Sequence, residues 1–260
     1  MQMIARPLGF IVKIIYDVLS ILDNPLISAY AMAIIVASIL LKLVLFPLTK
    51  KQTDSMKKMQ ELNPELAKLK LKYKNDSETL NRKTMELYKE NNVNPMGGCL
   101  PLLIQFPFLI GFFYVLREPV TYVFNGNQMA YDMINKSFIW INDLGFAANH
   151  VFENGLVNGL GMGGATLPLI GAAIPILAIL AGITTYVQTK MTTSTQPTGN
   201  DQQAATQNTM AMMMPVMIFF FALNFPSGLT LYWVVSNLFQ ITQQYVALHN
   251  GRKLVEVKTK

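Results

Sequence analysis

Cysteine, histidine and charged residues are scarce in this chain of 260 residues, and each scarcity excludes a class of protein. The single cysteine, Cys99, cannot form an intrachain disulfide and does not indicate a redox compartment. Only His150 and His249 are present, and no cluster of metal-ligand type is visible around them. The nucleotide-binding pattern GxxxxGK[ST] is also absent. We therefore expect neither a cofactor nor a nucleotide-driven step.

Charged residues make up only 14% of the chain, whereas about 25% is usual in soluble domains, and 52% of the residues are hydrophobic. A bilayer has a hydrocarbon core about 30 Å thick. The apolar runs long enough to cross it are 26–48, 96–116, 167–187, 210–225 and 229–248. Five such runs cannot all be hidden in one small core. The expected fold class is therefore an all-α polytopic membrane protein with five transmembrane helices.

The distribution of lysine and arginine between the loops predicts the orientation. The first loop, 49–95, holds ten lysines and one arginine, and the tail 249–260 adds four cations, so both belong in the cytosol. The connection 117–166 has two cations against four acidic residues and belongs outside, as does the turn 226–228. The N-terminus is then outside and the C-terminus inside. The net charge of +6 reflects this topology rather than sequence-specific nucleic-acid binding.

The first 25 residues are apolar but too short to span the bilayer, and they carry Lys13 and Asp17. An amphipathic helix lying on the outer surface fits this pattern. A signal peptide is the alternative, because Arg6 precedes an apolar run. No small-residue cleavage pattern follows before Asp23, however.

The basic loop 49–95 has the pattern of a helical hairpin. Between Thr53 and Tyr73 apolar residues recur every three or four positions, and a second helix fits 78–90 with Asp76 or Ser77 as its cap. The cations that could dock a ribosome, a targeting receptor or a translocase are Lys57, Lys58, Lys68, Lys72, Arg82 and Lys83. A solvated, positively charged connector explains the same residues, and their pattern leaves both readings open.

Other connections are less regular. The segment 188–209 is polar and low in complexity, so we expect it to be disordered. Asn94 and Pro95 suit the start of the second span as cap and first-turn residue, and the glycines of 155–164 predict a flexible loop. Aromatic side chains that suit a membrane interface are Phe138, Trp140 and Phe146.

Lys42 is a cation inside an otherwise apolar run. At about 1.5 Å per residue it lies roughly 10 to 12 Å from Lys50, which marks the membrane surface. A charge in the bilayer costs about 3 to more than 10 kcal/mol, so such residues usually face a protein interior or a wet cavity. The alternative is that the side chain snorkels towards the headgroups.

Polar residues inside the spans suggest what Lys42 faces. Those that we assign to a hydrated cavity with Lys42 are Ser38, Gln105, Thr184, Gln188, Trp233, Ser236, Asn237 and Gln240. For any one of them, a hydrogen bond between helices is the simpler explanation. A lysine together with polar faces on several helices is better explained by the cavity.

Two other classes of protein share some of these features. A small-solute or ion transporter also uses intramembrane charge, but no internal repeat is visible. An intramembrane hydrolase is suggested only by Ser38 and Lys42, one helical turn apart. A serine on an apolar helix usually bonds its own backbone, which weakens this second alternative.

Several motifs, in order, resemble the YidC/Oxa family of membrane protein insertases. They are Asn94-Pro95-Met96-Gly97-Gly98-Cys99-Leu100-Pro101 continuing to Gln105-Phe106-Pro107, the segment Ala181 to Gln188, and Phe225-Pro226-Ser227-Gly228-Leu229 followed by Leu231-Tyr232-Trp233 and Ser236-Asn237. The similarity covers 26–248. With no large domain before the first span, the chain resembles the shorter, Gram-positive-type members.

The resemblance implies a five-helix core whose groove opens to the cytosol and lipid but is closed outside, in a bacterial plasma membrane. It implies a non-enzymatic insertase and chaperone, functional as a monomer, that receives the polar or acidic flank of nascent membrane proteins with or without the Sec translocon. Ribosomes and the signal recognition particle receptor are further partners in this view. A groove arginine of the family corresponds to Lys42, which keeps the charge but loses the bidentate fork; Gln188 and Trp233 also correspond to groove residues.

Overall fold

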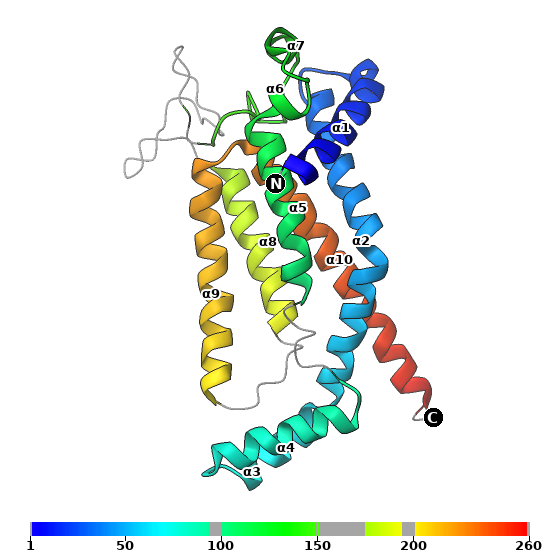
Figure 1. Cartoon of the computed structure of the whole chain (residues 1–260), viewed down its shortest axis with the longest axis vertical. Coiled ribbons are helices and arrows are strands. Elements are labelled where there is room, and N and C mark those ends of the chain that lie inside the picture. Colours follow the sequence, from blue (N-terminus) through cyan, green and yellow to red (C-terminus); the bar gives the residue numbers. More distant parts are fainter. Residues whose placement is uncertain (1, 94–99, 149, 151–174, 194–200, 259–260) are drawn as a thin grey trace. The chain divides into compact units, whose positions relative to one another are not determined.

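The computed structural model describes residues 2–93, 100–148, 150, 175–193 and 201–258, and the part described is mainly helical (Figure 1). The helices are α1 (Gln2–Leu19), the 3₁₀ turn η1 (Ser20–Leu22), α2 (Ala29–Glu61), α3 (Asn63–Lys72), α4 (Ser77–Glu90), α5 (Leu100–Arg117), α6 (Pro119–Tyr122), α7 (Gln128–Met133), α8 (Ile176–Thr193), α9 (Asp201–Asn224) and α10 (Ser227–Lys258). Among the described residues, Ala29–Met59 is long and apolar enough to cross a membrane, and Gln105–Arg117 and Ala211–Asn224 are shorter apolar helices.

The chain divides into two compact units. The first comprises Met1–Leu43, Gln105–Thr185 and Pro215–Phe239, and the second comprises Val44–Ile104, Tyr186–Met214 and Gln240–Lys260. Several long helices contribute a segment to each unit, because α2, α5, α8, α9 and α10 all cross the division.

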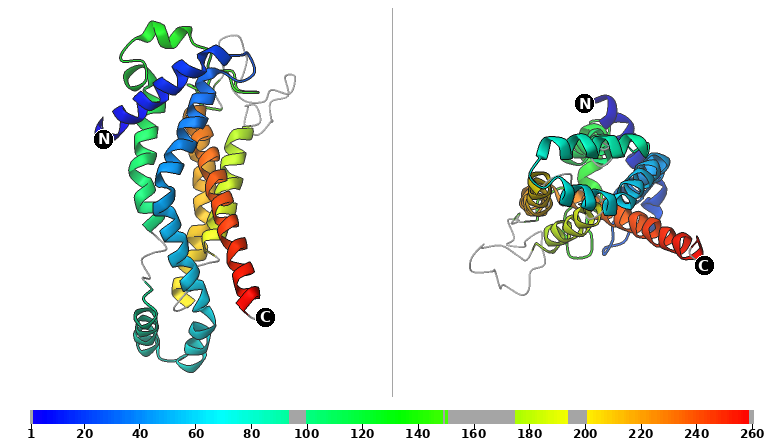
Figure 2. Two further views of the ribbon diagram at one scale, coloured as in Figure 1. Left: turned by 90° about the vertical axis from the view of Figure 1, so that its right-hand side faces the viewer. Right: turned by 90° about the horizontal axis from the view of Figure 1, so that it is seen from below.

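In the first unit, segments of α2, α5, α8, α9 and α10 run side by side, and α1, α6 and α7 lie at one end (Figures 1 and 2). Small residues allow close packing between the long helices. A β-carbon at Gly182 of α8 would lie 3.5 Å from Phe219 of α9, and one at Gly228 of α10 would lie 3.3 Å from Ile34 of α2. The core therefore forms where helices distant in sequence meet.

Helix α1 packs through one apolar face, formed by Ala5, Leu8 and Val12, which are all buried. Gly9 has no side chain where α1 crosses α6, because a β-carbon there would collide with the carbonyl oxygen of Tyr122. The contact is thus closer than any other residue at position 9 would permit. The opposite face of α1 is apolar as well but exposed, so the helix has one protein-facing and one outward-facing apolar surface.

A set of loop segments, here called the loop cap (residues 23–28, 135–147 and 226–228), joins the start of α2 to the α9–α10 turn. Main-chain bonds carry most of the connection: Ile139 N–H donates to Leu26 O (2.6 Å), and Gly228 N–H donates to Leu144 O (2.8 Å). Ser28 N–H donates to Ser137 O at 3.0 Å. These bonds pair backbone N–H and C=O groups that would otherwise lack a hydrogen-bond partner near the ends of helices.

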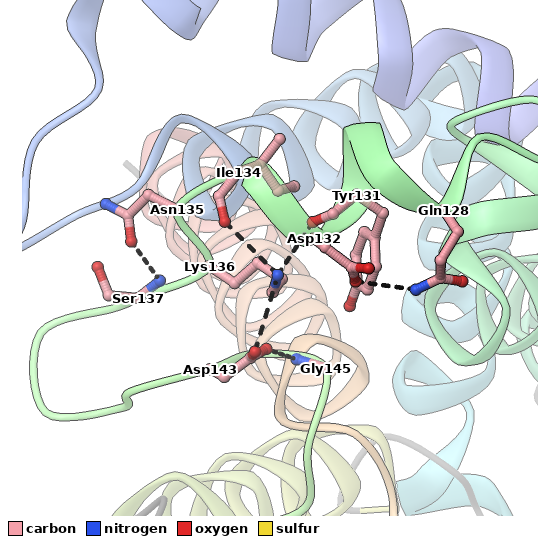
Figure 3. Close-up of polar contacts among 9 residues, drawn as sticks. All are labelled: Gln128, Tyr131, Asp132, Ile134, Asn135, Lys136, Ser137, Asp143 and Gly145. Atoms are coloured by element: carbon pink, nitrogen blue, oxygen red, sulfur yellow. Dashed lines mark hydrogen bonds and ion pairs between the residues drawn. The ribbon is translucent and has the colours of Figure 1, made fainter.

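Lys136 and Asp143 fix the fold of the loop cap from within (Figure 3). The Lys136 ammonium donates to the carbonyl of Tyr131 at 3.0 Å and lies 3.9 Å from an Asp143 oxygen. The other Asp143 oxygen accepts a bond of 2.7 Å from Gly145 N–H. Burial raises the pKa of Asp143 above its usual value, against the opposing effects of these two partners.

In the second unit, α3 and α4 form a hairpin, here called the basic hairpin. Its apolar cluster consists of Met59, Leu62, Leu66, Tyr88 and Val93, with Leu87 packed against it. Asp76 accepts a bond of 3.0 Å from Thr79 N–H and caps α4, which confirms the predicted cap. Hydrogen bonding with Thr79, through its side chain first and its backbone N–H second, lowers the pKa of Asp76.

Some predicted boundaries are wrong. The stripe expected as one helix from Thr53 to Tyr73 belongs instead to two helices, because Pro64 cannot continue α2 and lies in the first turn of α3. The segment predicted as disordered, 188–209, is helical at 188–193 and 201–209, where α8 and α9 extend through polar residues. Helix α10 likewise continues into the predicted tail, to Lys258. The expectations for Asn94, Pro95, Cys99 and the glycines of 155–164 lie outside the described residues.

Candidate functional site

Lys42 of α2 is buried in the first unit, with only 3% of its surface exposed. Its ammonium donates a hydrogen bond of 2.8 Å to Oε1 of Gln105 on α5. Among the described residues, Gln105 is the only acceptor of Lys42, and no carboxylate pairs with the ammonium. A snorkelling lysine would expose its ammonium, so this burial favours the interior-facing interpretation.

The Gln105 amide is held in turn by α10. Its Nε2 donates to the hydroxyl of Tyr232 at 2.9 Å, and the Tyr232 ring stacks on Phe112 with centroids 4.3 Å apart. Tyr232 and Phe112 are at most 1% exposed. Lys42, Gln105 and Tyr232, here called the lysine relay, therefore join α2, α5 and α10 through two hydrogen bonds.

Sequence reasoning found two members of the lysine relay and missed Tyr232 and Phe112. Tyr232 lies four residues before Ser236, so both lie on one face of α10. That spacing is the signal in the sequence that points to Tyr232. Trp233 itself is only partly buried.

Ser38 is fully buried, but its hydroxyl donates to the carbonyl of Ile34 at 2.6 Å, within the same helix. This is the local bond that a serine on an apolar helix usually forms. The hydroxyl proton of Ser38 is thus committed to the backbone. This arrangement gives no support to the serine–lysine hydrolase alternative, and it removes Ser38 from the side chains available to a ligand.

A second polar group links α8 to α10. Asn237 is 4% exposed, and its Nδ2 donates to the hydroxyls of Thr184 (3.2 Å) and Thr185 (2.9 Å). The Thr184 hydroxyl donates to Leu180 O at 2.7 Å. Ser236, next to Asn237, is also buried. Asn237 and Thr184 therefore form a hydrogen bond between helices, which was the simpler explanation for these polar residues than a hydrated cavity.

Gln188 and Gln240 belong to the second unit, where both are partly buried. Their assignment to the same cavity as Lys42, which lies in the first unit, stays a prediction. In the second unit a polar contact does join α10 to α2, since Gln243 donates to Thr49 at 2.7 Å.

The cations predicted to dock a partner differ in their surroundings. Lys58, Lys68, Lys72 and Arg82 are exposed and Lys57 is partly exposed. Lys83 instead lies 2.5 Å from Glu86, and this hydrogen bond raises the pKa of Lys83 and lowers that of Glu86. Lys83 is thus less available to an acidic partner than the others.

Comparison with known proteins identifies the family. The sequence matches the family described as "60Kd inner membrane protein" over residues 22–253. It is 39% identical over 218 residues to the membrane protein insertase YidC of Clostridium perfringens, covering 84% of this chain and 78% of the relative. It is 37% identical over 229 residues to YidC of Leptospira interrogans, covering 86% of this chain but only 31% of that relative.

A solved structure shows the same fold. The crystal structure of an active YidC insertase with its first transmembrane domain resolved matches 90% of this chain and 44% of its own, with a TM-score of 0.56 and 25% identity. The match extends over nearly the whole helical part, and the resemblance inferred from the motifs is confirmed. The chain therefore belongs to the 60Kd inner membrane protein family, the YidC/Oxa family that its motifs resemble.

Proposed function

We propose that this chain is a membrane protein insertase and chaperone rather than an enzyme, and that it acts in a bacterial plasma membrane. The names of its relatives support this, although the chain spans less than a third of the Leptospira relative's length. The proposed substrates are nascent membrane proteins with a polar or acidic flank beside an apolar segment.

The observation that carries the proposal is the buried ammonium of Lys42, whose partner among the described residues is a neutral amide. A buried charge is normally paired with an opposite charge. The bond from the Lys42 ammonium to the Gln105 amide involves one charge, and a carboxylate from a substrate would add the opposite charge, so that Coulomb attraction would strengthen the hydrogen bond. The site is thus better matched to an acidic ligand than to its resting partner.

We propose five transmembrane spans around a groove that opens to cytosol and lipid, with the N-terminus outside and the C-terminus inside. In this orientation the loop cap closes the outer end, in keeping with its dense main-chain bonding. Gln105, Trp233 and the second-unit residues Gln188 and Gln240 would contribute polar surface to the groove. Ser236, Asn237 and Thr184 would support it by joining helices.

The proposed mechanism needs no nucleotide. A hydrated groove shortens the apolar distance that a polar flank must cross, and Lys42 attracts its acidic residues. Transfer of the substrate's apolar segment from water to lipid then drives insertion. The protein lowers the kinetic barrier to insertion, which is already thermodynamically favourable.

The proposed contact for a ribosome, the signal recognition particle receptor or the Sec translocon consists of cations on α2 and the basic hairpin, namely Lys57, Lys58, Lys68, Lys72, Arg82 and Lys83. The chain is proposed to act as a monomer, since one groove open to lipid suffices for one substrate helix.

The test is insertion of a single-span protein into liposomes that contain only this chain. Substrates with an acidic and a neutral flank are compared for the parent, Lys42→Met and Lys42→Arg, with protease protection of the flank as readout. Lys51→Met is a matched control, because Lys51 is an exposed lysine on the same helix. We expect Lys42→Met to lose insertion of the acidic flank and Lys42→Arg to keep it. Equal insertion by Lys42→Met and Lys51→Met would exclude a role for the buried charge.

A further inference from the structure

A cavity of about 560 Å³ opens between α1 and the turn that follows α6. Its lining residues are Arg6, Phe10, Thr121, Tyr122, Asn125 and Gly126. All belong to the first unit and lie outside the lysine relay. Neither the motifs nor the proposed insertion mechanism assigns a role to this cavity.

The walls of the cavity are fixed by close backbone packing. The contact between Gly9 and the Tyr122 carbonyl holds α1 directly on α6. Asn125 (φ 52°) and Gly126 (φ 81°) adopt left-handed conformations, and Gly126 N–H donates to Val120 O at 2.8 Å. No atom lies within 4 Å of the position that a β-carbon of Gly126 would take. The turn is therefore tightly held, and open space lies beside Gly126, which lines the cavity.

The chemistry of the lining is cationic and rich in donors. Among the described residues of the lining, Arg6 alone is charged, and it has neither a hydrogen bond nor an ion pair with any described residue. Thr121 offers a hydroxyl and Asn125 an amide, both exposed. A planar guanidinium beside such donors matches the oxygens of a phosphate.

An apolar stripe begins at the cavity. Arg6, Phe10, Ile14 and Val18 are spaced by four residues and so share one face of α1. The three apolar members are 64%, 47% and 67% exposed, whereas the opposite face of α1 is buried against the protein. One face of α1 therefore carries a cation at one end and exposed apolar side chains along the rest. A phospholipid has the matching arrangement, with a charged headgroup at one end and apolar acyl chains beyond it.

We propose that the cavity binds the phosphate of an anionic phospholipid, whose acyl chains lie against Phe10 and Ile14. Arg6 pairs with the phosphate, and Thr121 and Asn125 donate to its oxygens. The described lining residues include no carboxylate that could hold the ammonium of a zwitterionic lipid, so the site prefers a lipid with a net negative charge. The proposal rests on the membrane placement of α1 in the proposed function.

The test is native mass spectrometry of the full chain released from nanodiscs of phosphatidylcholine and phosphatidylglycerol. We expect the parent to retain phosphatidylglycerol in preference to phosphatidylcholine. Arg6→Gln should weaken phosphatidylglycerol retention about tenfold, because a charge-assisted bond is lost, and Thr121→Val about threefold. Lys13→Gln is the matched control: it removes one charge from the same helix, but Lys13 pairs with Asp17 at 2.5 Å and does not line the cavity.

Three results would overturn the proposal. They are equal retention of the two lipids by the parent, equal losses in Arg6→Gln and Lys13→Gln, and displacement of the lipid by millimolar inorganic phosphate, which would indicate a site for the free anion. The liposome assay is run on the same variants. Retention that depends on Arg6 in a chain that inserts no substrate would refute the proposed function alone. Normal insertion without a lipid preference would refute the lipid site alone.

Discussion

Replacing Gln105 by glutamate would place a carboxylate where Lys42 now meets a neutral amide, with almost no change in side-chain shape. The parent bond is 2.8 Å long and the Gln105 side chain is already held by Tyr232. The parent bond already has a charged donor, so the new carboxylate adds a Coulomb attraction of about 4 kcal/mol at an effective dielectric constant of about 20, most of which the desolvation of the carboxylate offsets. The variant should therefore hold Lys42 about 1 kcal/mol more tightly, which corresponds to roughly a fivefold change in an equilibrium.

In the proposed mechanism, an acidic substrate flank must displace the resting partner of Lys42. Gln105→Glu should thus reduce insertion of an acidic-flank substrate about fivefold in the liposome assay. Insertion of a neutral-flank substrate should change much less, and the protein should remain folded. Asn81→Asp makes the same amide-to-carboxylate change at an exposed position on α4 and serves as the control. Unchanged insertion of the acidic flank by Gln105→Glu would refute the idea that substrate and Gln105 compete for Lys42.

Three further predictions concern other sites. Ser38→Ala should leave insertion near the parent level, because the Ser38 hydroxyl bonds only the backbone of its own helix; complete loss in the liposome assay would revive the hydrolase alternative. Gly9→Val should destabilise the protein by about 1–3 kcal/mol in thermal unfolding in detergent, because its side chain would collide with the Tyr122 carbonyl; an unchanged unfolding temperature would contradict the close contact. Because burial raises the Asp143 pKa, the folded state binds a proton more tightly than the unfolded state, so stability should fall as pH rises from about 4 through the raised pKa. Asp143→Asn should flatten this part of the pH profile, and an identical profile for parent and variant would exclude Asp143 as its cause.

Local patterns predicted the local features well. The Asp76 cap depends on a few consecutive residues, and the apolar stripe of the basic hairpin supplies Met59, Leu62 and Leu66 to a real cluster. Pro64 is the local signal in the sequence for the start of a new helix, α3. The extension of α8 and α9 through polar sequence was harder to foresee, because low complexity argues for disorder while the neighbouring helix favours continued hydrogen bonding.

The lysine relay could be predicted only in part. The unusual position of Lys42 drew attention to it, and Gln105 was recognised as a polar residue within a span. Their pairing joins positions 63 residues apart, and the bond from Gln105 to Tyr232 joins positions 127 apart. No short-range pattern encodes such contacts, which depend on how three helices pack.

The loop cap has a consequence for how freely its sequence can vary. Its links to Leu26, Leu144 and Ser137 use carbonyl oxygens, which every amino acid supplies. Many side chains along these segments can therefore be exchanged while the closure remains intact, provided that Lys136 and Asp143 still shape the loop. This end of the molecule should tolerate substitutions that would disrupt a closure built from side chains, leaving its surface free to diverge between species.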